Sequence, residues 1–296
     1  MVDSTKKEAG TSFKPKALHK TAAIIMLSGA FIAGCATKEI NSEPTRLYVF
    51  DCGAIESRDV SMFSPGVDEG QKKQLVNSCY LIKHAEGMLF WDTGLSDSLP
   101  PEGIELWNGA FQLSVTKTLK SQLDEIGVDP LSIDYLGISH FHGDHTGNAN
   151  YFVNSKVIIQ QEEKEAAFGE EAEKFGFSPE SYHKLSIDNV QGIEGDHDVF
   201  GDGTVIIKRA VGHTPGHQVL WVNLAETGPL LISGDLYHFT KNRTYKRVPS
   251  FNFSKPQTLA AFDSIEAYVK ETGSTMWIQH DKEQNAEIKH APDFYQ

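Results

Sequence analysis

The densest group of metal-ligand residue types lies within six positions, at His140, His142, Asp144 and His145. Alternate residues of an extended chain face the same side, so His140 and His142 can bind one ion. The turn that Gly143 permits then directs Asp144 and His145 toward a second ion. Imidazole together with carboxylate suits zinc best, and iron, cobalt or manganese accept the same ligands. The hexapeptide therefore predicts a pair of metal ions.

Three further ligand-type residues lie where other strand-like runs end: His213, Asp235 and His280. The runs that precede them cover residues 204–209, 230–234 and 276–279. Taken singly, each residue is more often a capping aspartate or a structural histidine than a ligand. All of these strand-like runs, however, are followed by a ligand-type residue. This favours one shared site over separate structural roles, since functional residues concentrate on the loops of a scaffold.

Short β-rich runs bounded by turn residues recur along the chain and predict the strands of the scaffold. They cover residues 47–50, 79–82, 88–91, 133–139, 157–159, 205–207, 219–222, 230–232 and 276–278. Apolar residues at helical spacing predict one helix over residues 114–126 and another between Ser254 and Gly273. Residues 53–77 read as a long loop of the kind that forms lids or substrate walls. Groups of strands separated by helices predict an α/β fold with two sheets flanked by helices.

Composition supports one large domain and argues against nucleic acid as a partner. The 296 residues are 40% hydrophobic, which is enough for a packed core. The net charge is -13, and it becomes about -16 without the five lysines and two acidic residues of positions 1–34. Such an acidic surface repels the phosphate backbone of nucleic acids. The local basic group at 241–247 could oppose this conclusion, but it is interpreted as a solvated loop.

The N-terminus resembles an export signal. Basic residues precede an apolar run over 22–34 that is too short to span a bilayer, and the run ends in Ile-Ala-Gly-Cys35. This tetrapeptide resembles the lipobox of bacterial lipoproteins, and Ala36 after it favours the outer membrane. We expect a signal peptide over 1–34, a tether over 35–45 and one folded domain over 46–296. The protein would be exported and anchored to the periplasmic side of the outer membrane through a lipid on Cys35. A plain signal peptide cut near Ala33 or Ala36, or an uncleaved anchor, is the alternative.

In an oxidising compartment, Cys52 and Cys79 are free to form a disulfide. Two separate buried thiols are at least as compatible with the sequence.

The order of ligand types resembles that of the metallo-β-lactamase superfamily, which has a His-x-His-x-Asp-His loop followed by His, Asp and His ligands. The resemblance implies an αββα sandwich of two mixed β-sheets flanked by helices. It also implies two Zn2+ ions and a division of the ligands between them. His140, His142 and His213 would bind the first metal, and Asp144, His145 and His280 the second. Asp235 would bridge both, which differs from true β-lactamases, where Cys or Ser is typical.

Five stretches are more narrowly similar to N-acyl homoserine lactonases: residues 48–53, 90–94, 194–197, 212–218 and 279–281. That family opens the lactone ring of bacterial quorum-sensing signals, so the resemblance implies a small-molecule lactone substrate. Asp144 would pass a proton to the leaving oxygen, and Asp92 would orient a metal-bound histidine. Lactonases have a tyrosine three residues after the bridging aspartate. This chain has His238 there and Tyr237 one position earlier, so either side chain could contact the substrate carbonyl. His217 is expected to be structural.

Four apolar residues, Met62, Phe63, Trp107 and Phe111, are candidates for the wall that binds an acyl chain. The first alternative function is another hydrolase of the same fold, acting as a thioesterase, a phosphotriesterase or a β-lactamase. The second is a non-catalytic zinc-binding lipoprotein. The sequence leaves the oligomeric state open, a homodimer included.

Overall fold

The computed structural model describes residues 43–296. The predicted signal peptide and most of the predicted tether lie outside these residues. The described chain forms two β-sheets, one of eight strands in the order β4-β5-β1-β2-β3-β6-β7-β8 and one of five in the order β13-β12-β11-β10-β9. Both sheets are mixed, because β3, β6, β7 and β8 run parallel beside an antiparallel half, and β13 runs parallel to β12 in an otherwise antiparallel sheet.

The elements have the following bounds. The eight-stranded sheet contains β1 (Arg46–Ser57), β2 (Lys73–His84), β3 (Gly87–Trp91), β4 (Ile104–Leu106), β5 (Phe111–Ser114), β6 (Tyr135–Gly137), β7 (Lys156–Gln160) and β8 (Val190–Ile193). The five-stranded sheet contains β9 (His197–Asp198), β10 (Val205–Arg209), β11 (Gln218–Leu224), β12 (Gly228–Ile232) and β13 (Thr275–Trp277). The α-helices are α1 (Leu119–Glu125), α2 (Gly143–Thr146), α3 (Gln161–Ala167), α4 (Thr240–Tyr245), α5 (Lys255–Thr272) and α6 (Lys282–Asn285). Single-turn 3-10 helices lie at Val60–Met62, Pro130–Ser132, Ala149–Tyr151, Ala172–Phe175, Pro179–Ser181, Ile187–Asn189 and Gly234–Leu236, the last of which is η7.

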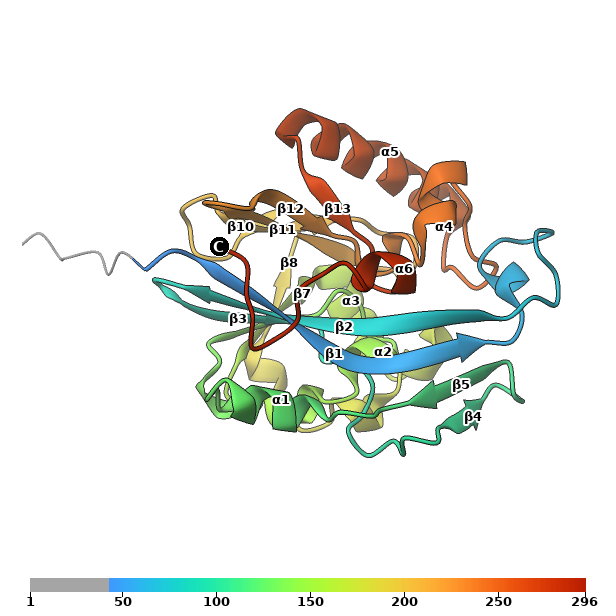
Figure 1. Ribbon diagram of the computed structural model, residues 1–296, viewed down its shortest axis with the longest axis horizontal. Helices are drawn as coiled ribbons and strands as arrows, with labels where there is room; N and C mark the ends of the chain where they lie inside the picture. Colours follow the sequence, from blue (N-terminus) through green and yellow to red (C-terminus); the bar gives the residue numbers. More distant parts are fainter. Residues whose placement is uncertain (1–42) are drawn as a thin grey trace, which may run out of the picture. The chain divides into compact units, whose positions relative to one another are not determined.

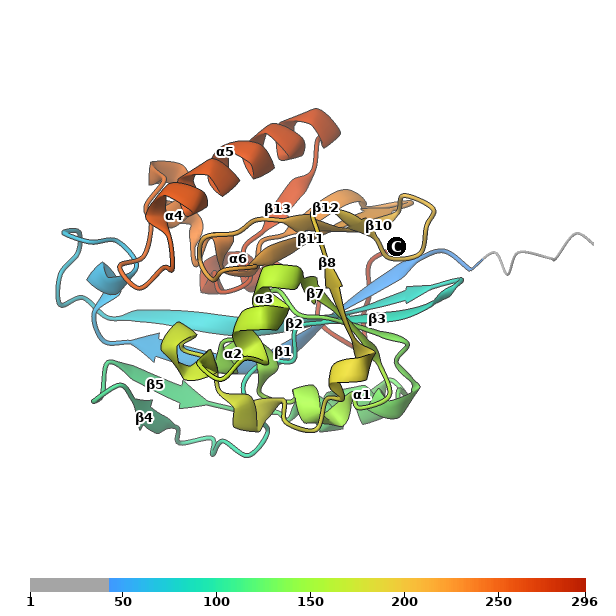
Figure 2. The same cartoon turned by 180° about the vertical axis from the view of Figure 1, so that it is seen from behind.

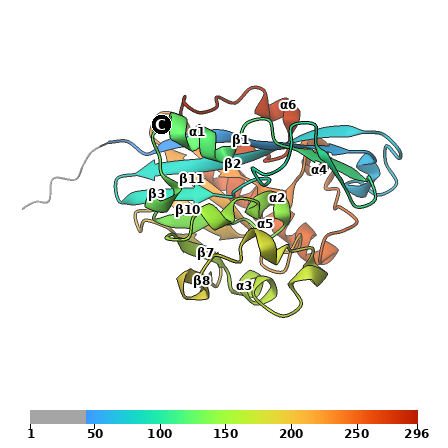
Figure 3. The same ribbon diagram turned by 90° about the horizontal axis from the view of Figure 1, so that it is seen from below.

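Side-chain alternation along the strands builds three stacked core layers. On β1, Leu47 and Val49 point into the layer between the two sheets, whereas Tyr48 and Phe50 point into the layer beneath α1 and α3. A third layer, which includes Phe262, lies between the five-stranded sheet and α5. Figures 1 and 2 show α5 and α1 on opposite outer sides of the paired sheets, and Figure 3 views the same stack from the side of α1. The predicted αββα sandwich is confirmed.

The bounds of one predicted helix and one predicted loop were wrong, and strand pairing explains both. The helix expected over 114–126 begins only at Leu119, because the residues up to Ser114 pair with β1 as strand β5. The side chain of Thr118 then caps α1 by accepting a hydrogen bond from the Ser121 N–H. The loop expected over 53–77 is shorter, since β1 continues to Ser57 and β2 begins at Lys73.

The late helix was predicted correctly at both ends. The side chain of Ser254 accepts a hydrogen bond from the Gln257 N–H, and Pro256 occupies the first turn of α5. Gly273 ends the helix with φ 67°, a left-handed conformation that glycine adopts without strain. Among residues 43–296, none of the helices is long and apolar enough to cross a bilayer.

The structure joins Cys52 and Cys79 in a disulfide between β1 and β2, with the two Cα atoms 5.9 Å apart. Of the two arrangements that the sequence left open, the structure has the cross-link.

Candidate metal centre

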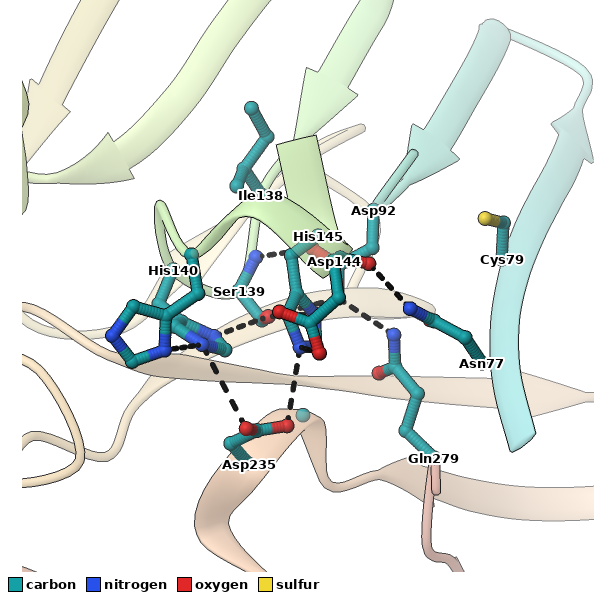
Figure 4. Close-up of polar contacts among 12 residues, drawn as sticks. Asn77, Cys79, Asp92, Ile138, Ser139, His140, Asp144, His145, Asp235 and Gln279 are labelled. Atoms are coloured by element: carbon teal, nitrogen blue, oxygen red, sulfur yellow. Dashed lines mark hydrogen bonds and ion pairs between the residues drawn. The ribbon is translucent and has the colours of Figure 1, made fainter. Parts of the chain in front are cut away.

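All seven predicted ligands lie together where several strands end. They form two adjoining groups. Within each group, the potential ligand atoms all lie within 4.8 Å of one another. The first group is His140, His142, His213 and Asp235, and the second group is Asp144, His145 and His280. The 140–145 loop follows β6, and the other three ligands follow β10, β12 and β13. Figure 4 shows Asp235 facing the 140–145 loop from the opposite side of the centre.

Three ring nitrogens of the first group converge on one point. His140 Nε2 lies 2.9 Å from His142 Nδ1, and His213 Nε2 lies 3.1 Å from each of these two atoms. Burial lowers the pKa of His142 to about 3 and that of His140 well below its usual value, so both rings are neutral. Neutral imidazole is the form that binds a metal. A cation shared by the three lone pairs fits this arrangement.

The second group has an excess of negative charge around its histidines. His280 Nε2 lies 3.3 Å from His145 Nε2, and Asp144 Oδ2 lies 3.7 Å from each of them. Burial alone would lower the pKa of His145, but Asp144, Asp235 and Asp92 raise it well above its usual value. This environment favours a positive charge, which a divalent cation would supply.

Asp235 connects the two groups through its two carboxylate oxygens. Oδ1 lies 2.9 Å from His280 Nε2 and 3.2 Å from His145 Nε2. Oδ2 lies 3.2 Å from His213 Nε2. One oxygen therefore faces each group, which is the geometry expected of a carboxylate that bridges two cations. The donor set fits a pair of divalent metal ions.

Buried polar groups hold the ligands from behind. The fully buried Asp92 accepts hydrogen bonds from the Ser139 N–H at 2.6 Å and the Gln279 side-chain amide at 2.8 Å, and it contacts His145 Nδ1 at 2.9 Å. Asp92 thus lies where it can orient His145, in agreement with the expectation for it. Ser139 and Gln279 each precede a ligand in the chain, but sequence reasoning missed both.

Other supporting contacts gave no local signal in the sequence. His213 Nδ1 lies 3.0 Å from the side-chain oxygen of Asn252, 39 positions away. His280 Nδ1 lies 2.7 Å from the carbonyl of Val76, 204 positions away. His217 is structural, as expected, because its Nδ1 contacts a backbone carbonyl and its Nε2 accepts the Asp235 N–H at 2.9 Å. It thereby fixes the backbone of the bridging residue.

The structure separates the two candidates for the carbonyl contact. The Tyr237 hydroxyl donates to Glu266 at 3.1 Å, and the ring stacks on Phe262 beneath α5, so this side chain does not reach the centre. His238 does reach it, with Nε2 3.0 Å from Asp235 Oδ2 and its ring 4.7 Å from that of Phe63. Of the pair, only His238 is placed to meet a substrate.

A cavity of about 590 Å³ opens onto the centre. Its apolar walls include Phe63, Trp107 and Phe111, as predicted, but not Met62. Further lining residues that the sequence did not single out are Ile55, Leu75, Leu106, Leu113, Phe175, Phe177 and Phe251. Ligand-type residues from both groups form its floor: His142, Asp144, Asp235 and His280, together with His238. A molecule with an apolar chain and a polar reacting end fits such a cavity.

Comparison with known proteins agrees with this fold and this centre. A family model described as the metallo-beta-lactamase superfamily matches residues 73–272. N-acyl homoserine lactonase AttM of Rhizobium radiobacter is 28% identical over 263 residues, covering 84% of this chain and 98% of AttM. An N-acyl homoserine lactonase of a Bacillus species is 30% identical over 245 residues, covering 80% of this chain and 93% of its own.

A solved structure with a TM-score of 0.75 and 27% identity covers 85% of this chain and 99% of its own. It is an N-acyl homoserine lactone hydrolase with the product N-hexanoyl-L-homoserine at its catalytic metal center. The fold and the paired ligand groups define a metal-dependent hydrolase. The chain belongs to the metallo-beta-lactamase superfamily.

Proposed function

We propose that this enzyme hydrolyses the ester bond of N-acyl homoserine lactones and so opens their ring. One observation carries the proposal: the carboxylate of Asp235 spans both ligand groups at the floor of an apolar cavity. The lactone ring would lie over the two groups, and the acyl chain would lie along the aromatic wall. The lactonases that the chain resembles are named for this reaction.

The proposed metal ligands are the seven residues of the two groups, with Asp235 shared between them. Zinc suits this donor set best, and iron, cobalt or manganese are the alternatives. When bound, two such ions supply electrophilic polarisation of the ester carbonyl and activation of water at neutral pH.

Side chains of the chain itself orient the substrate and move protons. Asp144 lines the cavity, and its carboxylate can receive a proton from the attacking water and deliver it to the leaving ring oxygen. His238 lines the same cavity and is placed to hydrogen-bond a polar group of the substrate. Phe63, Trp107 and Phe111 would bind the acyl chain and exclude water from the reacting end.

Export and lipid anchoring through Cys35 are a separate part of the proposal, supported by the lipobox-like N-terminus. The net charge of -13 opposes binding to nucleic acid.

A substrate panel tests the reaction. The metal-loaded full chain should open homoserine lactones faster than it cleaves a thioester, a phosphotriester or a β-lactam. Asp235→Asn should lower the lactonase rate by several orders of magnitude, because the amide cannot place an anionic oxygen toward each group. Asp263→Asn is the matched control, since this aspartate is exposed on α5 and, among residues 43–296, pairs only with Lys246. A panel in which lactones stay closed while another ester class is cleaved would refute the lactonase proposal. Equal activity of Asp235→Asn and wild type would refute the role of the centre.

A further inference from the structure

A carboxylate outside the ligand set, that of Glu163, lies directly behind the first group. Glu163 belongs to the first turn of α3 and is fully buried. Burial raises the pKa of its carboxyl to about 7, so burying an ionised glutamate here is unfavourable. An apolar side chain of similar size would fill the same space without this penalty, which indicates that the polar contacts of Glu163 matter.

Both carboxylate oxygens accept backbone hydrogen bonds, and the two donors come from different ligand loops. Oε1 accepts the N–H of Phe141 at 2.9 Å, and Oε2 accepts the N–H of Gly216 at 2.8 Å. Phe141 lies between His140 and His142, and Gly216 lies three positions after His213. One side chain therefore connects the loops that carry all three histidines of the first group.

The second loop approaches α3 so closely that only glycine fits at position 216. A Cβ atom on Gly216 would lie 2.5 Å from the backbone nitrogen of Glu163 and 3.0 Å from Cβ of Gln160. Real Cβ atoms do not approach backbone atoms at such distances. The close approach allows the short hydrogen bond between the Gly216 N–H and Glu163.

The second group is held by different residues. His145 contacts the carboxylate of Asp92, and His280 contacts the carbonyl of Val76. The Asp144 backbone carbonyl accepts a hydrogen bond from Asn77 at 2.6 Å. Loosening the contacts of Glu163 therefore leaves these supports in place.

We infer that Glu163 is a positioning residue that sets the spacing of His140, His142 and His213, and so tunes metal binding at the first group but not at the second. The inference rests on the proposed function only in that both groups bind metal. It adds to the centre a side chain whose hydrogen bonds go to backbone N–H groups and that does not line the cavity.

Glu163→Gln in the full chain tests the inference. The glutamine oxygen can accept only one of the two N–H groups, and its NH2 then faces the other donor. Removing a supporting group of this kind weakens metal binding by about 10–100-fold. We expect the zinc content after dialysis against a weak chelator to fall from two ions to one per chain. Anomalous diffraction at the zinc edge should locate the remaining ion at the second group.

Glu162→Gln is the matched control, because Glu162 is the preceding residue of α3 and pairs with Arg209 at the surface. It should retain both ions. The inference is overturned if Glu163→Gln keeps two ions with wild-type affinity. It is also overturned if the variant fails to fold or loses both ions equally, since Glu163 would then support the fold as a whole. Because the readout is metal content, wild-type protein that binds two ions without opening lactones would reject the proposed function and leave this inference standing.

Discussion

Asp92→Asn should weaken metal binding at the second group more than at the first. Asp92 contacts His145 directly, whereas it reaches His140 only through the Ser139 hydroxyl, which lies 3.1 Å from His140 Nδ1. Asp92 is fully buried, and its Oδ1 accepts the Ser139 N–H. Its Oδ2 contacts three groups, namely the Ser139 hydroxyl, the Gln279 amide and His145 Nδ1. The substitution keeps the size of the side chain but removes its charge and one of its acceptor oxygens.

The magnitude follows from these contacts. If the asparagine oxygen takes the place of Oδ2, its NH2 faces the Ser139 N–H, and a buried donor without an acceptor costs about 1–3 kcal/mol. The contact to His145 also loses its charge assistance, which removes roughly half its strength. Part of this cost falls on the whole fold, and the part that loosens His145 corresponds to a loss of about 10–100-fold in affinity. Such a loss equals about 1.4–2.8 kcal/mol of binding free energy.

Zinc titration of the metal-free chain measures this effect. Wild type should bind two ions, and the Asp92→Asn variant should show one step weakened by the stated factor and one step weakened less. Asp263→Asn serves again as the exposed control. Second-group affinity within twofold of wild type, or an equal loss in both steps, would show that Asp92 does not orient His145. Together with Glu163→Gln, the experiment separates the two groups, since each variant should weaken a different group more strongly.

Three other outcomes are expected. Replacing Cys52 and Cys79 with serine should lower the free energy of unfolding by roughly 3.5 kcal/mol. This value comes from the loop-entropy relation for two cysteines separated by 27 residues. Urea unfolding under oxidising conditions measures the change. An unchanged urea midpoint would contradict the stabilisation expected from the disulfide. Hydrogen bonds from Arg243 hold the pKa of Glu266 below 4.5, so this carboxylate stabilises the fold above pH 4.5 and the stabilisation is lost as the pH falls through the lowered pKa. Between pH 5 and 3, wild type should therefore lose up to about 1 kcal/mol more than Glu266→Gln, and parallel curves would refute this. Trp107 is 54% exposed on the cavity wall, so Trp107→Ala should raise KM several-fold for long-chain lactones and leave short-chain lactones and stability unchanged.

Local pattern predicted the elements well where a single segment carried its own signals. Helix α5 had its cap, proline and terminal glycine in sequence, and both ends agree with the structure. The start of α1 could not be placed, because residues 111–114 pair with β1, more than 50 positions earlier in the chain. Pairing between distant segments depends on which edge is free in the folded sheet, and no local window contains that information.

The sequence by itself determined which residue types would form the centre. A hexapeptide with four ligand-type residues, and three more such residues at strand ends, already predicted that His140, Asp235 and His280 belong to one site. Only the tertiary structure decided how the centre is supported and which neighbour enters the cavity. His238 faces the cavity and Tyr237 does not, because the backbone at Tyr237 is extended, so that neighbouring side chains point to opposite sides, and the tyrosine hydroxyl donates to Glu266 on α5. Ligand identity is a property of side-chain chemistry that is visible along the chain. Orientation and hydrogen-bond partners instead arise from contacts between distant residues, such as Val76 and His280, which are 204 positions apart.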